Sequence, residues 1–189
     1  MSLDLDQRRG WPAELRVLLD HHPRELWPAQ RAADVQFWLQ IHDHFRRDCI
    51  ALETLAGDYH ERRKSARELA VIAAPRLRTL VSNLHGHHQV EDHHYFPAFR
   101  AAESRLTAGF DVLESDHGEL QKNVTAALTA MRELRAAVEQ PATTSGGDSA
   151  ALAGRQYVAA VSTLCRRLIR HLSDEEDLVI PLLLERGDY

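Results

Sequence analysis

The chain has little of several features that mark other classes of protein. Its 189 residues include two cysteines, nine glycines and seven prolines. So few breaks favour long helices over a loop-rich all-β fold. No apolar run is long enough to span a membrane, and no amino-terminal stretch joins a basic region to a long apolar one. Because Cys49 and Cys165 both lie in predicted helices, we expect a reduced, cytoplasmic protein without a membrane partner.

A basic surface is also missing. The formal net charge is −5 and the isoelectric point is near 6.2, so we expect no nucleic-acid partner. Histidine, in contrast, is abundant, with 12 residues. The positions of these histidines decide the functional interpretation.

Apolar residues recur at alternating steps of three and four, which predicts long amphipathic helices. We expect four of them, over residues 31–57, 75–96, 104–139 and 151–184. A shorter lead-in helix over 60–72 is expected between the first and the second. Helices of this kind with short connections favour an all-α fold, an antiparallel up-down-up-down four-helix bundle.

The bundle is expected over residues 31–189, as one domain. A short N-terminal arm over 1–30 precedes it, with a short helix near 12–20. Residues 140–150 are rich in Gly, Ser and Thr, and we interpret them as a loop.

Two segments repeat one motif, a histidine followed four residues later by a glutamate. The pairs are His87 with Glu91 and His171 with Glu175, and each is followed by a proline at the same offset. A spacing of four places both side chains on one face of a helix. Each pair can therefore supply half of a metal site.

Each long helix carries one histidine on its apolar stripe. Uncompensated burial of such groups costs several kcal/mol, so they need partners or a metal. Imidazoles and carboxylates without thiolate suit iron, and six ligands exceed a tetrahedral zinc site. We predict two metal ions bridged by both carboxylates, with the ligands His42, His87, Glu91, His117, His171 and Glu175.

These residues resemble the hemerythrin family, in its bacterial hemerythrin-like (HHE cation-binding) branch. The resemblance covers about 30–185 and rests on the two repeated motifs together with Ile41-His42-Asp43 and Asp116-His117. In that family, such positions hold a non-heme diiron site that takes up O₂, and some members are linked to nitric oxide, peroxide or redox sensing. The resemblance implies two iron ions, oxo- or hydroxo-bridged, held by the six predicted ligands.

The chain departs from the O₂-carrying members at one position. Where they have a second histidine one turn after the third-helix ligand, this chain has Gln121. That change leaves a position open to a small ligand. His94 is a candidate substitute or a polar neighbour of the site, and Tyr95 either hydrogen-bonds the site or packs beside it.

Other polar residues near the motifs are expected outside the ligand set. His85, His88 and His93 are predicted at the surface or beside the ligands. Three acids, Asp92, Glu176 and Asp177, are solvated, or some of them orient ligating imidazoles.

Three functions fit this sequence. The first is a protein that binds O₂, NO or peroxide in redox or oxygen sensing or defence. The second is a catalase-like enzyme that disproportionates or reduces hydrogen peroxide, which the open position at Gln121 favours. The third is an iron store or a structural metal bundle.

Overall fold

The computed structural model describes residues 3–29, 32–140 and 144–186. Over these residues it is helical without strands, which confirms the predicted all-α class. None of the helices found there combines the length and apolar character that a membrane crossing needs.

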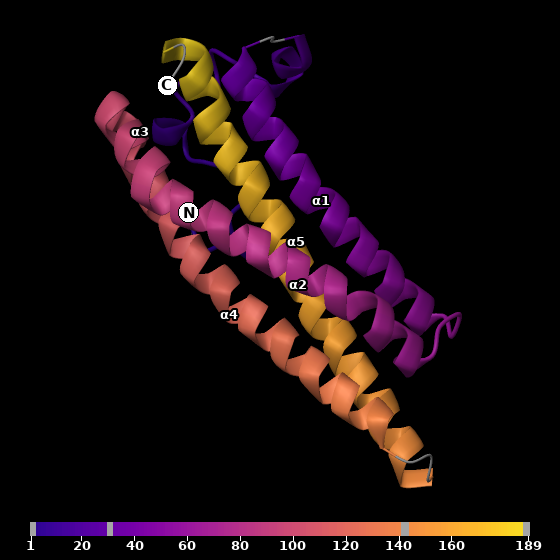
Figure 1. Cartoon of the computed structure of the whole chain (residues 1–189). Coiled ribbons are helices and arrows are strands. Elements are labelled where there is room, and N and C mark those ends of the chain that lie inside the picture. The colour runs from indigo at the N-terminus through magenta and orange to yellow at the C-terminus, as the bar shows by residue number, and fades with distance from the viewer. Residues whose placement is uncertain (1–2, 30–31, 141–143, 187–189) are drawn as a thin grey trace. The chain divides into compact units, whose positions relative to one another are not determined.

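Long helices carry most of the described chain (Figure 1). They are α1 Ala33–His60, α2 Ala66–Val90, α4 Thr107–Glu139 and α5 Thr144–Arg186. Three short elements join α2 to α4, namely the π-helical turn η3 Glu91–Tyr95, α3 Phe96–Ala102 and the 3-10 turn η4 Ser104–Leu106. The segment before α1, residues 3–29, contains the 3-10 turns η1 Ala13–Leu15 and η2 Arg24–Ala29. We call it the N-terminal segment.

The prediction of separate helices over 60–72 and 75–96 is wrong. One helix, α2, runs through Pro75 and ends at Val90. A proline inside a helix leaves the carbonyl four residues earlier without its donor. Here that carbonyl belongs to Val71, a residue that is 69% exposed.

Two further boundaries differ from prediction. The helix near 12–20 is only the turn η1 followed by irregular turns, because so short a segment gains little from helical hydrogen bonds alone. The prediction of a loop over 140–150 is wrong for residues 144–150, since α5 already begins at Thr144. Extending an existing helix gains one hydrogen bond for each residue fixed, which offsets a weak composition. Residues 141–143 lie outside the described part.

The chain divides into two compact units. Unit 1 comprises Met1–Phe45, Gly86–Gly118 and Arg167–Tyr189, and unit 2 comprises Arg46–His85 and Glu119–Arg166. Each of the long helices therefore contributes one portion to each unit.

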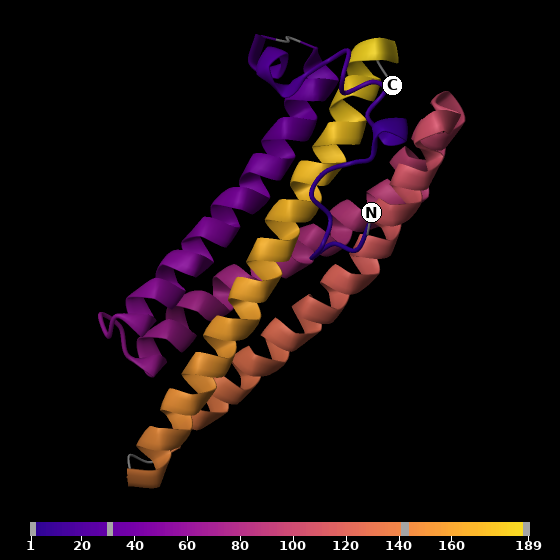
Figure 2. The same ribbon diagram turned by 180° about the vertical axis from the view of Figure 1, so that it is seen from behind.

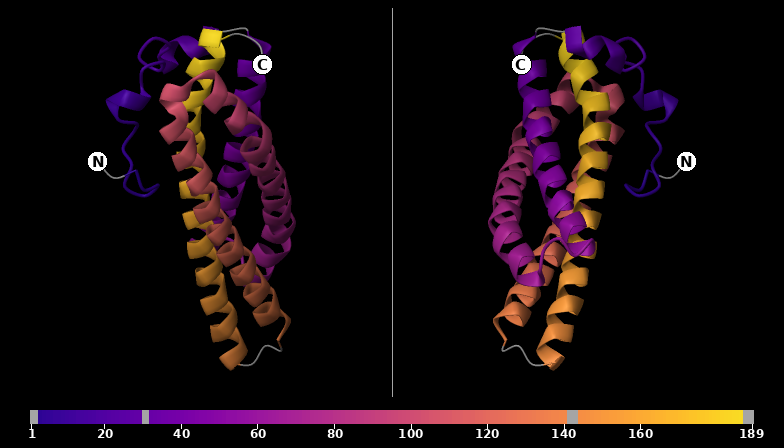
Figure 3. Two further views of the ribbon diagram at one scale, coloured as in Figure 1. Left: turned by 90° about the vertical axis from the view of Figure 1, so that its left-hand side faces the viewer. Right: turned by 90° about the vertical axis from the view of Figure 1, so that its right-hand side faces the viewer.

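Unit 1 has an aromatic core. Its buried residues include Trp11, Trp27, Trp38, Phe96, Phe99 and Phe110, with leucines from the end of α5. The N-terminal segment runs beside the C-terminal end of α5 (Figure 2), and Figure 3 shows it on the outer side of that end. Trp11 fixes it there by donating from Nε1 to the carbonyl of Asp174 over 2.7 Å.

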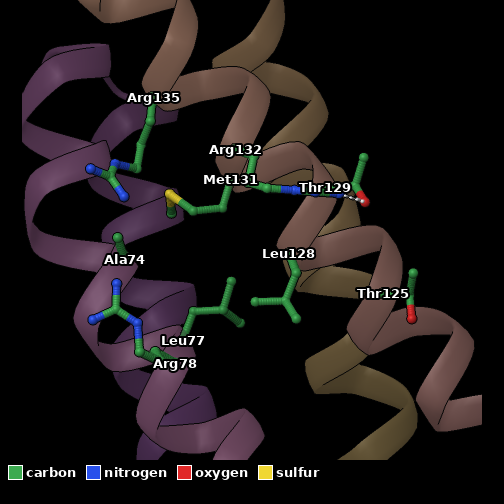
Figure 4. A pocket seen from close by; sticks show the side chains of 9 residues that line it. All are labelled: Ala74, Leu77, Arg78, Thr125, Leu128, Thr129, Met131, Arg132 and Arg135. Carbon is green, nitrogen blue, oxygen red and sulfur yellow. Dashed lines mark hydrogen bonds between the residues drawn. The ribbon is translucent and has the colours of Figure 1, made fainter.

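Unit 2 has a mainly aliphatic core that also buries Tyr157 and both cysteines, Cys49 and Cys165. It contains a hollow of about 450 Å³ between α2 and α4 (Figure 4). Leu77 and Leu128 form its apolar part, and Arg78 and Arg135 reach its rim from different helices. Among the described residues that line it there is no histidine, cysteine or acid, so it is not a candidate metal site.

Candidate metal centre

All six predicted ligands lie in unit 1, each brought by a helix or by the π turn. Helix α1 supplies His42, α2 supplies His87, and the π turn supplies Glu91; α4 supplies His117, and α5 supplies His171 and Glu175. Five of these residues are buried, and the side chain of His87 is 11% exposed. The alternating apolar steps that predicted them are the positions that the fold turns inward.

The ligand atoms form two groups, and within each group they lie within 4.8 Å of one another. One group contains His42, His87, Glu91 and Glu175. The other contains His117, His171 and a histidine that the sequence analysis placed outside the ligand set, His88. We call them the four-residue group and the three-histidine group.

Each glutamate faces both groups. Glu91 has Oε1 3.0 Å from Nε2 of His87 and Oε2 3.5 Å from Nε2 of His117. Glu175 has Oε1 3.5 Å from Nε2 of His42 and Oε2 3.4 Å from Nε2 of His171. A carboxylate with one oxygen toward each of two neighbouring donor sets can bridge two cations.

Several of these buried atoms have no hydrogen-bond partner. They are Nε2 of His42, His87 and His88, both carboxylate oxygens of Glu91, and Oε2 of Glu175. Buried polar atoms are nearly always paired, so such a concentration needs an explanation. Cations that accept these lone pairs provide one, and the donor set of imidazole nitrogen and carboxylate oxygen fits iron.

Acidic residues hold the imidazoles from behind. His42 bonds Glu176 through Nδ1 at 3.0 Å, and His117 bonds Asp92 in the same way at 2.8 Å. The Nδ1 of His171 lies 3.4 Å from Oδ2 of Asp116. Such pairing fixes the ring and directs Nε2 toward a metal. Of the predicted alternatives for Asp92 and Glu176, the orienting role is the one that the geometry supports.

Comparison with known families agrees with this geometry. The model of the hemerythrin HHE cation binding domain matches residues 33–183. The chain belongs to this family. No curated protein and no solved structure matches the chain. Membership makes it a cation-binding helical protein of the hemerythrin HHE type, and the N-terminal segment lies outside the matched residues.

His88 is the residue of this hemerythrin HHE domain that sequence reasoning missed. It is 8% exposed, and its ring stacks on His117 with centroids 3.8 Å apart and planes within 9°. The signal was available, because His88 precedes Glu91 by three residues, a spacing that also shares a helix face. Of the two places predicted for His88, the surface is wrong and the place beside the ligands is the one observed, whereas His85 and His93 are exposed.

The π turn explains why His94 is not at the centre. The backbone N–H of Phe96 donates to the carbonyl of Glu91, five residues earlier, so the inward stripe passes from Glu91 to Phe96. This wider turn rotates His94 outward, where it is exposed. Its Nδ1 bonds the carbonyl of His93 at 3.0 Å, which Pro97 cannot serve because it lacks an N–H. The structure therefore does not bring His94, predicted as a substitute ligand or a polar neighbour, to the two groups.

Gln121 is exposed as well, so the structure does not bring it to the two groups. The buried stripe of α4 continues from His117 to Leu120, a step of three rather than four. Tyr95 is half-buried and packs edge-on against Trp38, with ring centroids 4.9 Å apart. Trp38 in turn donates from Nε1 to Oε1 of Glu175 at 3.0 Å. Of the two roles predicted for Tyr95, packing is the one observed.

Burial and charge move the pKa values of the histidines in opposite directions. Burial would lower the pKa of His42, but the carboxylates of Glu175 and Glu176 outweigh it and raise the pKa to about 9. Burial lowers the pKa of His87 to about 3 and that of His88 well below its ordinary value. The last two rings are thus held neutral with a lone pair available, the form that binds a metal.

The pKa values of the two glutamates are also shifted in opposite directions. Burial, and then the neighbouring Glu175, raises the pKa of Glu91 well above its ordinary range. Burial acts in the same sense on Glu175, but His42 and His171 outweigh it and hold the pKa of Glu175 well below its ordinary range. In this hemerythrin HHE domain the surroundings thus favour the neutral form of Glu91 and the ionised form of Glu175.

Proposed function

We propose that this chain is a non-heme diiron protein that binds O₂, NO or peroxide inside the helical fold. The arrangement of the glutamates carries the proposal, because each directs one oxygen toward each donor group. Glu91 and Glu175 would bridge two iron ions. The antiparallel up-down-up-down order of the four long helices belongs to the same proposal.

The two ions would have unequal surroundings. One would be held by His88, His117 and His171 together with the two bridging glutamates. The other would be held by His42 and His87 with the same glutamates, and so by one imidazole fewer. Iron commonly accepts more ligands than this second set supplies, which leaves room for a small molecule there.

Iron is favoured over zinc by the donor set. Structural zinc is almost always four-coordinate and commonly uses thiolate. The two groups together offer seven side chains, five imidazoles and two carboxylates, and both cysteines lie in unit 2. When bound, an iron pair supplies two electrons to the small ligand.

The protein's own residues would keep the metal centre dry and fixed. Trp38, Phe96 and Phe110 belong to the aromatic core of unit 1 that includes neighbours of the ligands. Asp92, Asp116 and Glu176 orient three of the imidazoles. A rigid, apolar surround limits the access of water, which favours binding of an uncharged gas.

Reversible binding is favoured over peroxide turnover by the place of His88. The argument for an enzyme relied on a missing imidazole at Gln121, and His88 supplies a third imidazole to the group that contains His117. With His88 as a ligand, the position that the sequence predicts to be open beside His117 would be filled. We retain binding or sensing as the function, and turnover of hydrogen peroxide becomes an outcome of the test.

The test uses protein purified without added metal and then loaded anaerobically with iron(II). About two irons per chain, and a spectral change with O₂ or NO that reverses on degassing, would support the proposal. Oxygen evolution from hydrogen peroxide well above that of free iron would favour the enzyme instead. The exposed His94 gives a matched control, since His94→Ala should behave as wild type and His117→Ala should lose iron. If the protein contains only zinc as purified and takes up no iron(II), or binds no metal at all, the proposal is overturned.

A further inference from the structure

The N-terminal segment lies outside the family match, yet it reaches the residues behind the candidate ligands. Two of its arginines contact acids that hold ligand imidazoles, Arg8 at Asp116 and Arg24 at Glu176. We infer that the N-terminal segment is part of the metal centre, with Arg8 and Arg24 as positioning residues for His171 and His42. The inference rests on the proposed metal site and adds to it a layer that the matched domain does not contain.

Arg8 is a fully buried cation. Its side chain is 0% exposed, and it donates from one terminal nitrogen to Asp116 at 2.5 Å and from Nε to Asp174 at 2.7 Å. Its second terminal nitrogen donates to the carbonyl of Leu3 at 2.8 Å, and the guanidinium lies over the ring of Trp11. Desolvating a cation is costly, so a buried guanidinium needs the opposite charges that Asp116 and Asp174 place against it.

One of those acids leads directly to a ligand. Oδ2 of Asp116, the oxygen that Arg8 contacts, is also the oxygen 3.4 Å from Nδ1 of His171. Without Arg8, the carboxylate of Asp116 would accept a stronger hydrogen bond from Nδ1–H of His171 and would also be free to rotate. Arg8 thus sets both the direction of the His171 ring and the electron density that it offers to a metal.

Arg24 repeats this arrangement at the other group. It donates from Nε to Asp177 at 2.7 Å and from a terminal nitrogen to the carbonyl of Ser173 at 2.5 Å. Its other terminal nitrogen lies 3.7 Å from Oε2 of Glu176, whose Oε1 bonds His42. The segment therefore places one cation behind an imidazole of each group.

A positive charge held near a metal pair favours its less positive, reduced state. Replacing Arg8 or Arg24 by a neutral residue should therefore shift the reduction potential of the loaded protein downward. Loss of an acid bonded to a ligating imidazole typically weakens metal binding by about 10- to 100-fold. Arg8 and Arg24 contact such acids rather than the imidazoles, so each glutamine variant should weaken binding by less than that. The effect should be smaller for Arg24→Gln, because the Arg24 side chain is 39% exposed and its charge is partly screened.

The experiment compares Arg8→Gln, Arg24→Gln and their lysine counterparts with Arg9→Gln, whose exposed side chain is the adjacent control. Each full-length protein is loaded with iron, its potential is measured by redox titration, and iron loss to a chelator is timed. The inference expects a lower potential and faster loss in both glutamine variants, partial recovery with lysine, and wild-type values for Arg9→Gln.

If the segment only stabilises the fold, the glutamine variants would have a lower melting temperature but an unchanged potential and an unchanged rate of iron loss. That result would overturn the inference. If Arg8→Gln does not fold, the partly exposed Arg24 decides by itself. If the wild-type protein binds another metal and no iron, the proposed iron function is overturned. The rate at which the variants lose that metal to the chelator would still test the inference. Wild type without any metal would overturn both.

Discussion

The metal-free protein should gain stability when Glu91 is replaced by leucine. Glu91 is 1% exposed, and neither carboxylate oxygen has a hydrogen-bond partner, although Nε2 of His87 lies 3.0 Å from Oε1. Burial, followed by the neighbouring Glu175, raises the pKa of Glu91 well above its usual range. Without cations the fold therefore carries a buried, unsatisfied carboxyl group, and leucine removes it.

The magnitude follows from that unsatisfied group. A buried polar group left without a partner costs roughly 1–3 kcal/mol, and a volume-conserving exchange usually costs less than about 1.5 kcal/mol in packing. We expect the free energy of unfolding of metal-free Glu91→Leu to exceed that of metal-free wild type by about 1 kcal/mol. Iron should reverse the order, because ligand at a thousand times its Kd stabilises by about 4 kcal/mol and the variant would lack one of the two proposed bridging ligands.

Urea unfolding followed by circular dichroism measures both quantities, once with a chelator and once anaerobically with iron(II). Glu119→Leu is the control, because it changes the same residue type at a side chain that is 43% exposed, and both values should stay within about 0.5 kcal/mol of wild type. If metal-free Glu91→Leu unfolds more easily than metal-free wild type, Glu91 is a satisfied structural residue. The argument from orphaned ligand atoms would then be refuted.

Three more predictions concern single side chains. His88→Ala should weaken iron retention against a chelator by at least about tenfold, whereas removing the exposed ring in His94→Ala should not; equal losses would contradict the assignment of His88. Tyr157→Phe should raise the free energy of urea unfolding by about 1 kcal/mol, because the buried hydroxyl has no partner, and a decrease would oppose this reasoning. A hydrogen bond from Arg105 lowers the pKa of Glu103 from 4.5 to about 2, so Glu103 stabilises the fold above pH 4.5 and this is lost as the pH falls toward 2. Glu103→Gln should therefore lower the free energy of unfolding by only roughly 1 kcal/mol at pH 7, because Arg105 is largely exposed. This loss should become progressively smaller below pH 4.5, and a loss independent of pH would contradict the ion-pair explanation.

Most of the candidate centre could be predicted from the sequence, and His42 and His171 show why. Both continue an apolar stripe at helical spacing, and the fold buries such a stripe whatever else it contains. His88 was missed because only spacings of four were counted, although a spacing of three serves equally well. His94 was misplaced for a different reason. A uniform helical period was assumed through residues 91–95, where the chain forms a π turn.

The sequence by itself determined the helical class, the inward histidines and glutamates, and the family, because amphipathic spacing and ligand motifs are local properties of the chain. Only the tertiary structure decided how the ligand atoms divide into two groups and that each glutamate faces both. It also decided that Arg8 enters from the N-terminal segment to reach Asp116, 108 residues away in sequence. Contacts of that kind depend on which elements the packing of the core brings together, and no local spacing records them.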